Sequence, residues 1–129
     1  MSYTLDFLGD KWSFLIIRDI MLYGKSTYGE FLASEEKIAT NILGDRLNML
    51  EAQDFLTKRV SPDKKNKFIY NLTEKGISLV PMVMEMGLWG SQYNPPGLAQ
   101  DIVDQLKADK VGTIAAIQEK LRSVLHKNE

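Results

Sequence analysis

Positive charge in this chain is gathered in one short segment, residues 57–75. The segment holds six basic and two acidic side chains, a net charge of +4, although the whole chain of 129 residues carries a formal net charge of −1. Three of the lysines lie in "SPDKKNK" (61–67), where Ser-Pro-Asp is typical of a turn. Lysine ammonium groups on a loop can hold phosphate or another anion. A run of charged residues on a loop is also commonly no more than a solvated turn. The elements next to this loop must therefore distinguish the two interpretations.

The other residues that could do chemistry form no catalytic or metal-binding pattern. The chain has no cysteine, which removes disulfides, thiolate metal sites and thiol-based redox sensing. His126 is the only histidine and lies near the C-terminus, where capping a helix is a more common role than catalysis. There is no glycine-rich phosphate loop and no nucleophile at motif spacing from a base. We therefore expect no enzyme activity, no metal and no cofactor.

A second polar set falls on one face of a helix that the apolar spacing predicts over residues 39–53. Leucines at i, i+4 and i+7 mark its buried face, at Leu43, Leu47 and Leu50. The opposite face is small and polar, and consists of Thr40, Asn41, Gly44, Asp45 and Asn48. Asn41 can pair with adenine through two amide hydrogen bonds, and Thr40 can contact a thymine methyl or a phosphate. Thr40 also has a plainer interpretation as the residue that starts the helix.

Two further residues of this helix each allow two interpretations. Arg46 lies between the two faces, and it either contacts DNA or pairs with Glu30 or Asp45. Gly44 costs about 1 kcal/mol against alanine in a helix interior. A glycine kept at that cost indicates close approach of the helix to DNA or to another helix.

The elements around these residues follow a definite order. The sequence predicts a helix over 11–22 ended by Gly24, a short helix capped by Ser26, a helix start at 34–36, the helix over 39–53, strands over 55–60 and 67–72, and a long helix from Thr73 to residue 89 or 93. Pro81 should kink the last of these, because proline lacks an N–H. Beyond "NPPG" (94–97), two more helices are expected within 98–109 and 111–125.

This order is that of a winged helix-turn-helix, in which a recognition helix is followed by a two-stranded wing. The expected fold class is therefore mainly α with a small two-stranded β-hairpin, and with additional C-terminal helices. The helix over 39–53 takes the place of the recognition helix. "SPDKKNK" becomes the tip of the wing, which favours contact with phosphates over a merely solvated turn.

The chain resembles the HxlR-type transcriptional regulators, bacterial winged helix-turn-helix proteins related to the MarR group. It does so in "LGDKWSFLIIRDIMLYGKSTYGEFLAS" (8–34), in "IATNILGDRLNMLE" (38–51), and in "LTEKG" followed by "LWG" (72–76 and 88–90). The resemblance covers about residues 5–92 and implies a cytoplasmic, DNA-binding homodimer that represses or activates nearby genes. Family members commonly carry a cysteine shortly before the "GDKW"-like motif, and this chain has none. Thiol sensing is therefore not implied here.

The residues and the resemblance together predict a sequence-specific DNA-binding regulator. The recognition helix would enter the major groove of a palindromic operator, and the wing would lie on the backbone or in the minor groove. Residues expected to contact DNA are Thr40, Asn41, Asp45, Arg46, Asn48, Lys58, Arg59, Lys64, Lys65, Asn66 and Lys67. Residues expected at a homodimer interface are Val80, Met84, Leu88, Trp89, Ile114, Ile117 and Leu121. Residues 1–93 would form the DNA-binding domain with its post-wing helix, and 94–129 a helical extension for dimerisation.

Three alternatives remain open from the sequence. The acidic total and the weakly charged recognition face also suit a winged helix that binds proteins and no DNA. Trp12, Trp89 and the nearby methionines suit a ligand pocket as well as core or dimer packing, which leaves room for a small-molecule effector of unknown identity. The sequence shows neither the target genes nor whether they are activated or repressed.

Overall fold

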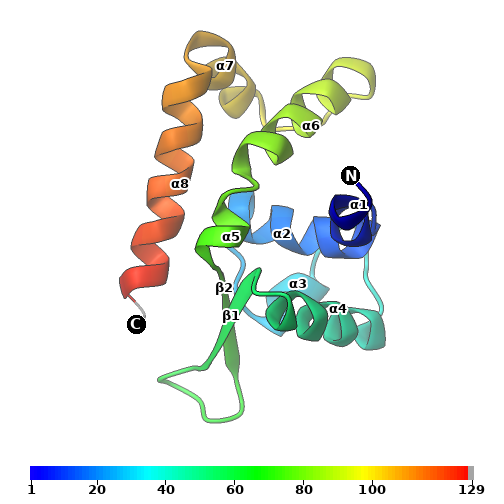
Figure 1. Ribbon diagram of the computed structural model, residues 1–129, viewed down its shortest axis with the longest axis vertical. Coiled ribbons are helices and arrows are strands. Elements are labelled where there is room, and N and C mark those ends of the chain that lie inside the picture. Colours follow the sequence, from blue (N-terminus) through cyan, green and yellow to red (C-terminus); the bar gives the residue numbers. More distant parts are fainter. Residues whose placement is uncertain (128–129) are drawn as a thin grey trace. The chain divides into compact units, whose positions relative to one another are not determined.

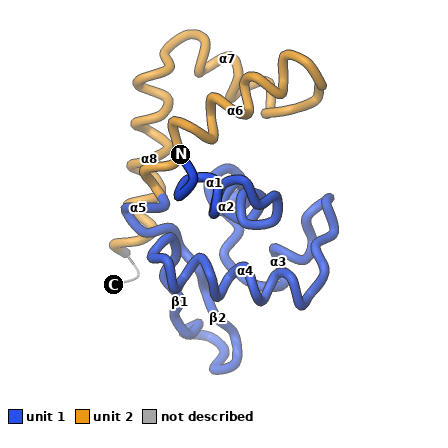
Figure 2. Tube along the Cα trace, turned by 45° about the vertical axis from the view of Figure 1, so that its right-hand side comes forward, with its two compact units in different colours: residues 1–76 blue, residues 77–129 orange. Residues whose placement is uncertain are grey.

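The computed structural model describes residues 1–127 (Figure 1). Its helices are α1 (Ser2–Leu8), α2 (Lys11–Tyr23), α3 (Tyr28–Leu32), α4 (Thr40–Ala52), α5 (Glu74–Ile77), α6 (Val80–Tyr93), α7 (Gln100–Ala108) and α8 (Lys110–Lys127), and its strands are β1 (Leu56–Val60) and β2 (Phe68–Leu72). The chain folds as two compact units, residues 1–76 and the part from Ile77 onward (Figure 2). The predicted division into functional domains at residues 93 and 94 stays a prediction.

The predicted hairpin is confirmed. Strands β1 and β2 pair antiparallel, with Leu56 opposite Leu72 and, at the other end, Val60 opposite Phe68. The backbone N–H of Tyr70 also donates to the carbonyl of Ser26 at 2.7 Å. A lone hairpin is marginally stable in water. This bond ties β2 to the segment that precedes α3, so the hairpin is held by the helical part of its unit.

The three predicted leucines of α4 form the centre of the first unit's core. Leu43, Leu47 and Leu50 are fully buried, as are Ile17 of α2 and Phe31 of α3. The ring of Phe31 also lies 6.4 Å from the ring of Tyr70, edge to face. Helices α2, α3 and α4 therefore share one core with β2. This is the predicted winged helix-turn-helix, with α4 as the recognition helix and the hairpin as the wing.

The start of α3 differs from the prediction by one residue. Thr27, rather than Ser26, is the N-cap, because its side chain accepts a hydrogen bond from the Glu30 N–H at 3.3 Å. The Glu30 carboxylate accepts in return from the Thr27 N–H at 3.1 Å, which completes a capping box. Burial alone would raise the pKa of Glu30, but hydrogen bonds from Ser26 and Thr27 lower it below its usual value.

The observed helices differ from the predicted ones in three places. No helix starts at 34–36, where the chain makes a turn. Helix α1 was not predicted, and it has no buried residue that would have marked a stripe. The long helix after the wing is divided into α5 and α6, and Pro81 lies in the first turn of α6 instead of kinking an interior. Proline fits there because the first turn of a helix does not need its N–H.

The second unit contains α6, α7 and α8. Its buried side chains include Val83 and Met84 of α6, Leu106 of α7 and Leu125 of α8. Lys110 at the start of α8 pairs with Glu85 of α6 at 2.5 Å. Within residues 1–127, every helix is too short or too polar to span a lipid bilayer.

Candidate nucleic-acid interface

The outward face of α4 carries the polar side chains that the sequence singled out. Thr40, Asn41, Asp45 and Asn48 are exposed, and all lie away from the buried leucines. The last three are spaced i, i+4 and i+7, so they form one stripe along the helix. A Cβ built on Gly44 would meet nothing within 4 Å. No neighbour among the residues described explains this glycine, so packing on another helix within the chain is not its role.

The N-terminal end of α4 is held by α3. The hydroxyl of Tyr28 donates to the carbonyl of Thr40 at 2.7 Å. Thr40 and Asn41 form the first turn of α4, and neither side chain is covered by this contact, since both residues are exposed. This hydrogen bond therefore positions the first turn of α4 and leaves its polar side chains accessible.

Arg46 joins the middle of α4 to the start of α2. Its Nε donates to Oδ2 of Asp10 at 2.9 Å and its Nη2 to Oδ1 of Asp10 at 3.3 Å. Its Nη1 donates to Asp45 at 2.6 Å. Of the two partners considered for Arg46 from the sequence, Asp45 is bound and Glu30 is not. The main partner, Asp10, was not predicted. Through Asp10 and Arg46, the "GDKW" and "RLNMLE" motifs are joined physically.

The Asp10 carboxylate has two tasks in this arrangement. It is the N-cap of α2, where it accepts from the Ser13 N–H at 2.8 Å. The hydrogen bond from Arg46 holds the pKa of Asp10 at about 2, against the opposing effect of burial. Hydrogen bonds to Asp10 likewise raise the pKa of Arg46. Both groups are therefore charged at neutral pH, and the link between α2 and α4 is an ion pair.

The "LTEKG" motif holds the C-terminal end of α4. The Thr73 hydroxyl donates to the Asp54 carbonyl at 2.5 Å and accepts from the Gly76 N–H at 3.2 Å. Lys75 donates to the carbonyl of Gln53 at 2.7 Å. Lys75 belongs to the basic segment of the sequence, yet it binds the backbone at the end of α4 and is not part of the wing. With Tyr28 and Arg46, this motif makes the third attachment of α4.

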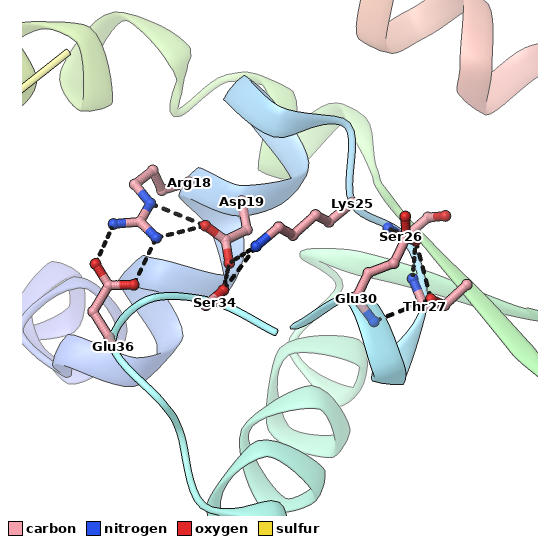
Figure 3. Close-up of polar contacts among 8 residues, drawn as sticks. All are labelled: Arg18, Asp19, Lys25, Ser26, Thr27, Glu30, Ser34 and Glu36. Carbon is pink, nitrogen blue, oxygen red and sulfur yellow. Dashed lines mark hydrogen bonds and ion pairs between the residues drawn. The ribbon is translucent and has the colours of Figure 1, made fainter. Parts of the chain in front are cut away.

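A second set of polar contacts joins α2 to the turn that precedes α4 (Figure 3). Asp19 of α2 is 2% exposed, and its carboxylate accepts from Arg18 at 2.6 Å, from Lys25 at 3.4 Å and from the Ser34 hydroxyl. Arg18 also donates to both oxygens of Glu36, at 2.9 and 3.0 Å. The hydrogen bond from Arg18 holds the pKa of Glu36 at about 2, against the effect of burial. The cluster fastens the turn ahead of α4 to α2.

The wing presents its basic side chains in two different ways. At its base, the Lys58 ammonium lies 4.2 Å from the centre of the Phe68 ring, a cation–π contact. Arg59 points to the opposite face of the hairpin and is half-buried, with an Nε that has no hydrogen-bond partner in residues 1–127. The tip is exposed, and consists of Pro62, Asp63, Lys64, Lys65, Asn66 and Lys67.

The residues predicted at a dimer interface lie in the second unit and differ in exposure. Val80 and Met84 are fully buried within the chain itself. Trp89 is 68% exposed and its ring lies 5.1 Å from that of Tyr93. The remaining four are half-buried, namely Leu88, Ile114, Ile117 and Leu121. Trp89 also lines an open concavity of about 940 Å³ formed by α6, α7, the loop between them and the start of α8.

Comparison with known proteins places this arrangement in a family. The HxlR-like helix-turn-helix model matches residues 7–97. The HTH-type transcriptional regulator YodB of Bacillus subtilis (strain 168) is 33% identical over 97 residues, which are 75% of this chain and 86% of YodB. The uncharacterized regulator YdeP of the same organism is 31% identical over 105 residues, covering 81% of this chain and 77% of YdeP.

Solved structures agree with the sequence comparison. The redox regulator HypR in its reduced form is similar with a TM-score of 0.64 and 32% identity, covering 73% of this chain and 92% of HypR. The reduced form of YodB from B. subtilis gives a TM-score of 0.59 and 32% identity, covering 76% of this chain and 95% of YodB. The chain therefore belongs to the HxlR-like helix-turn-helix family, whose members are transcriptional regulators and not enzymes.

Proposed function

We propose that this chain binds operator DNA in the cytoplasm as a homodimer, with α4 in the major groove and the wing on phosphates or in the minor groove. One observation carries the proposal. The exposed polar stripe of α4 and the exposed lysines of the wing belong to a single compact unit, residues 1–76. A polar helix face suits base edges and a basic loop suits the DNA backbone.

The two elements divide the work of binding. Lys64, Lys65 and Lys67 supply affinity, because phosphate contacts release counterions and weaken with salt. Asn66 at the tip and Lys58 and Arg59 at the wing base lie on the same element and complete its contact with the backbone. Thr40, Asn41, Asp45 and Asn48 face the bases, since the N-terminal part of a recognition helix enters the groove. Arg46 is placed by Asp10 at the edge of this face.

Replacing Lys64, Lys65 and Lys67 together by alanine tests the wing. At physiological salt we expect the affinity for labelled DNA from upstream of the gene to fall about 10- to 100-fold. The slope of log affinity against log salt should become shallower by roughly 5, because the proposed homodimer loses six lysines and about 0.9 ion is released per phosphate contact. Fluorescence anisotropy titrations at several salt concentrations measure both quantities.

A matched triple variant controls for a general effect of charge. Replacing Lys107, Lys110 and Lys120 by alanine removes the same charge from the second unit, and we expect the affinity and salt slope of the wild type. Equal affinity and equal salt slope for the wing variant and the wild type would remove the wing from the mechanism.

The alternative is a winged helix that binds proteins and no DNA. The observation in its favour is that the exposed face of α4 includes two acids, Asp45 and Glu51, and no lysine. A wild-type protein that fails to bind its upstream DNA even at low salt would favour this alternative over the proposed function.

The homodimer is supported by apolar side chains that the second unit leaves in solvent. Met86, Trp89 and Tyr93 are 48%, 68% and 66% exposed and are spaced i, i+3 and i+7, so they form one stripe on α6. We propose that this stripe meets a second copy, together with the half-buried Leu88, Ile114, Ile117 and Leu121. Val80 and Met84, already buried, would support it from within.

The oligomeric state tests the dimer directly. Sedimentation equilibrium at micromolar concentration should give twice the chain mass of 14.7 kDa. Replacing Trp89 by serine should shift the mass towards the monomer, because an exposed tryptophan is a frequent anchor of an interface. A monomeric wild type at that concentration would contradict the proposed homodimer. It would also remove the reason to expect a palindromic operator.

A further inference from the structure

Asp45 is an unexpected residue on the outward face of α4. Its side chain is 70% exposed and lies between Asn41 and Asn48 on the polar stripe. A carboxylate in a DNA groove is repelled by the phosphates around it. It is therefore unfavourable in such a position unless a hydrogen-bond donor on the DNA compensates for it.

An ion pair with Arg46 does not account for Asp45. The Asp45 side of this pair is exposed, and exposed ion pairs contribute little to stability. Arg46 moreover has a second carboxylate, Asp10, which binds it through two nitrogens. Removing Asp45 would leave Arg46 paired, so Asp45 is not needed to neutralise it.

The geometry leaves one oxygen of Asp45 available. Arg46 donates to Oδ2 at 2.6 Å. No hydrogen bond among residues 1–127 uses Oδ1. Arg46 is itself fixed by Asp10, so it holds the Asp45 carboxylate in a defined orientation. The neighbouring Gly44 has no side chain and open space around it, which lets the helix backbone approach the groove closely at this point.

We propose that Asp45 is a specificity-determining residue that selects a cytosine in the operator, with Oδ1 accepting a hydrogen bond from the N4 amino group. This inference rests on the proposed function of DNA binding. In the major groove, cytosine presents a donor at N4, whereas adenine presents its N6 donor beside the N7 acceptor. A carboxylate has only acceptors, so N7 disfavours adenine. Arg46 and Asp10 are positioning residues for this contact.

The helix geometry also places the cytosine relative to a second base. Asn41 and Asp45 are four residues apart, which is roughly 6 Å along the helix axis. Base pairs follow each other at about 3.4 Å. The cytosine should therefore lie about two base pairs from the adenine that Asn41 is proposed to read.

Selection of binding sites from a random DNA pool tests the inference. We expect the wild type to enrich sites with a C·G pair at one position in each half-site. Asp45→Ala should lose that preference, by about 10-fold in relative affinity for cytosine over the other bases, and keep its other preferences. Asp45→Asn should shift the preference at the same position towards adenine, because an amide pairs with N6 and N7. Direct titration of single-base operator variants measures the fold-change.

Glu51→Gln is the matched control, since Glu51 is an exposed acid on the same helix near its C-terminal end. It removes the same charge and should keep the cytosine preference. An Asp45→Ala variant with the wild-type preference at every position would overturn the inference while leaving the proposed function intact. Loss of a preference for a base other than cytosine would overturn it as well. A wild type that binds no DNA would overturn the proposed function itself.

Discussion

Replacing Asp19 by alanine is expected to lower the free energy of unfolding by about 3 kcal/mol. Asp19 is buried and accepts from Arg18, Lys25 and Ser34. Removing one partner of a buried ion pair leaves the other charges uncompensated, which costs about 3–5 kcal/mol. The lower end applies because Arg18 and Lys25 each keep 21% side-chain exposure and can reach some water. The midpoint of urea unfolding, followed by circular dichroism, should fall by roughly 1–3 M.

An exposed acid from the same region provides the control for Asp19. Glu35→Ala removes a carboxylate that lies in solvent, and its unfolding midpoint should stay within the error of the wild type. Asp19→Asn should fall between the two, because an amide oxygen can still accept from Ser34 but carries no charge. An Asp19→Ala variant that unfolds at the wild-type midpoint would show that the cluster does not hold the first unit together.

The pH dependence of unfolding follows from the same cluster. Hydrogen bonding to Arg18 lowers the pKa of Glu36 from 4.5 to about 2. Because the folded-state value is the lower one, the contribution to stability is present above pH 4.5 and is lost as the pH falls towards 2. The Asp10–Arg46 pair, with a pKa of about 2 for Asp10, weakens over a similar range. Lowering the pH from 4.5 towards 2 should therefore lower the free energy of unfolding, because both ion pairs are lost.

Replacing Gly76 by alanine should destabilise the protein by about 2 kcal/mol. In an exposed helix the same change would stabilise by up to about 1 kcal/mol. Here the new Cβ would lie 2.6 Å from the Phe55 carbonyl oxygen and 2.8 Å from Cδ2 of Leu72. That carbonyl is fixed, since it accepts from the Thr73 N–H at 3.0 Å. Overfilling a packed site typically costs 1–3 kcal/mol, and urea unfolding measures the loss.

Gly90 offers the matched control for Gly76. It lies inside α6, and a Cβ there would meet nothing within 4 Å. Gly90→Ala should leave the free energy of unfolding unchanged or raise it slightly. If both alanine variants moved the unfolding midpoint in the same direction, the close approach at Gly76 would not be the cause.

Local patterns were sufficient to predict α4 and the wing. The leucine spacing in α4, the β-branched and aromatic residues of both strands and the alternation in β2 are local features of the chain. The observed bounds differ from the predicted ones by a residue or so. The exposed stripe of α4 followed from the same periodicity. The lysines of the wing tip were identified by charge alone, and the structure shows them exposed.

Contacts between distant residues were not predictable from these patterns. Asp10 was not singled out from the sequence, because its partner Arg46 lies 36 positions away. The sequence around Ser34 and Glu36 favoured a helix start by local rules. In the fold, both side chains instead bind the Arg18 and Asp19 cluster on α2. A tertiary ion pair thus outweighs the local helix signal there.

The three attachments of α4 have a consequence for regulation. The helix is fixed at its first turn by Tyr28, in its middle by Arg46 and just beyond its last turn by Thr73 and Lys75. A signal that tilted α4 within its own unit would have to break several of these bonds together. In the proposed homodimer, control is therefore easier through the distance between the two recognition helices than through the orientation of either one.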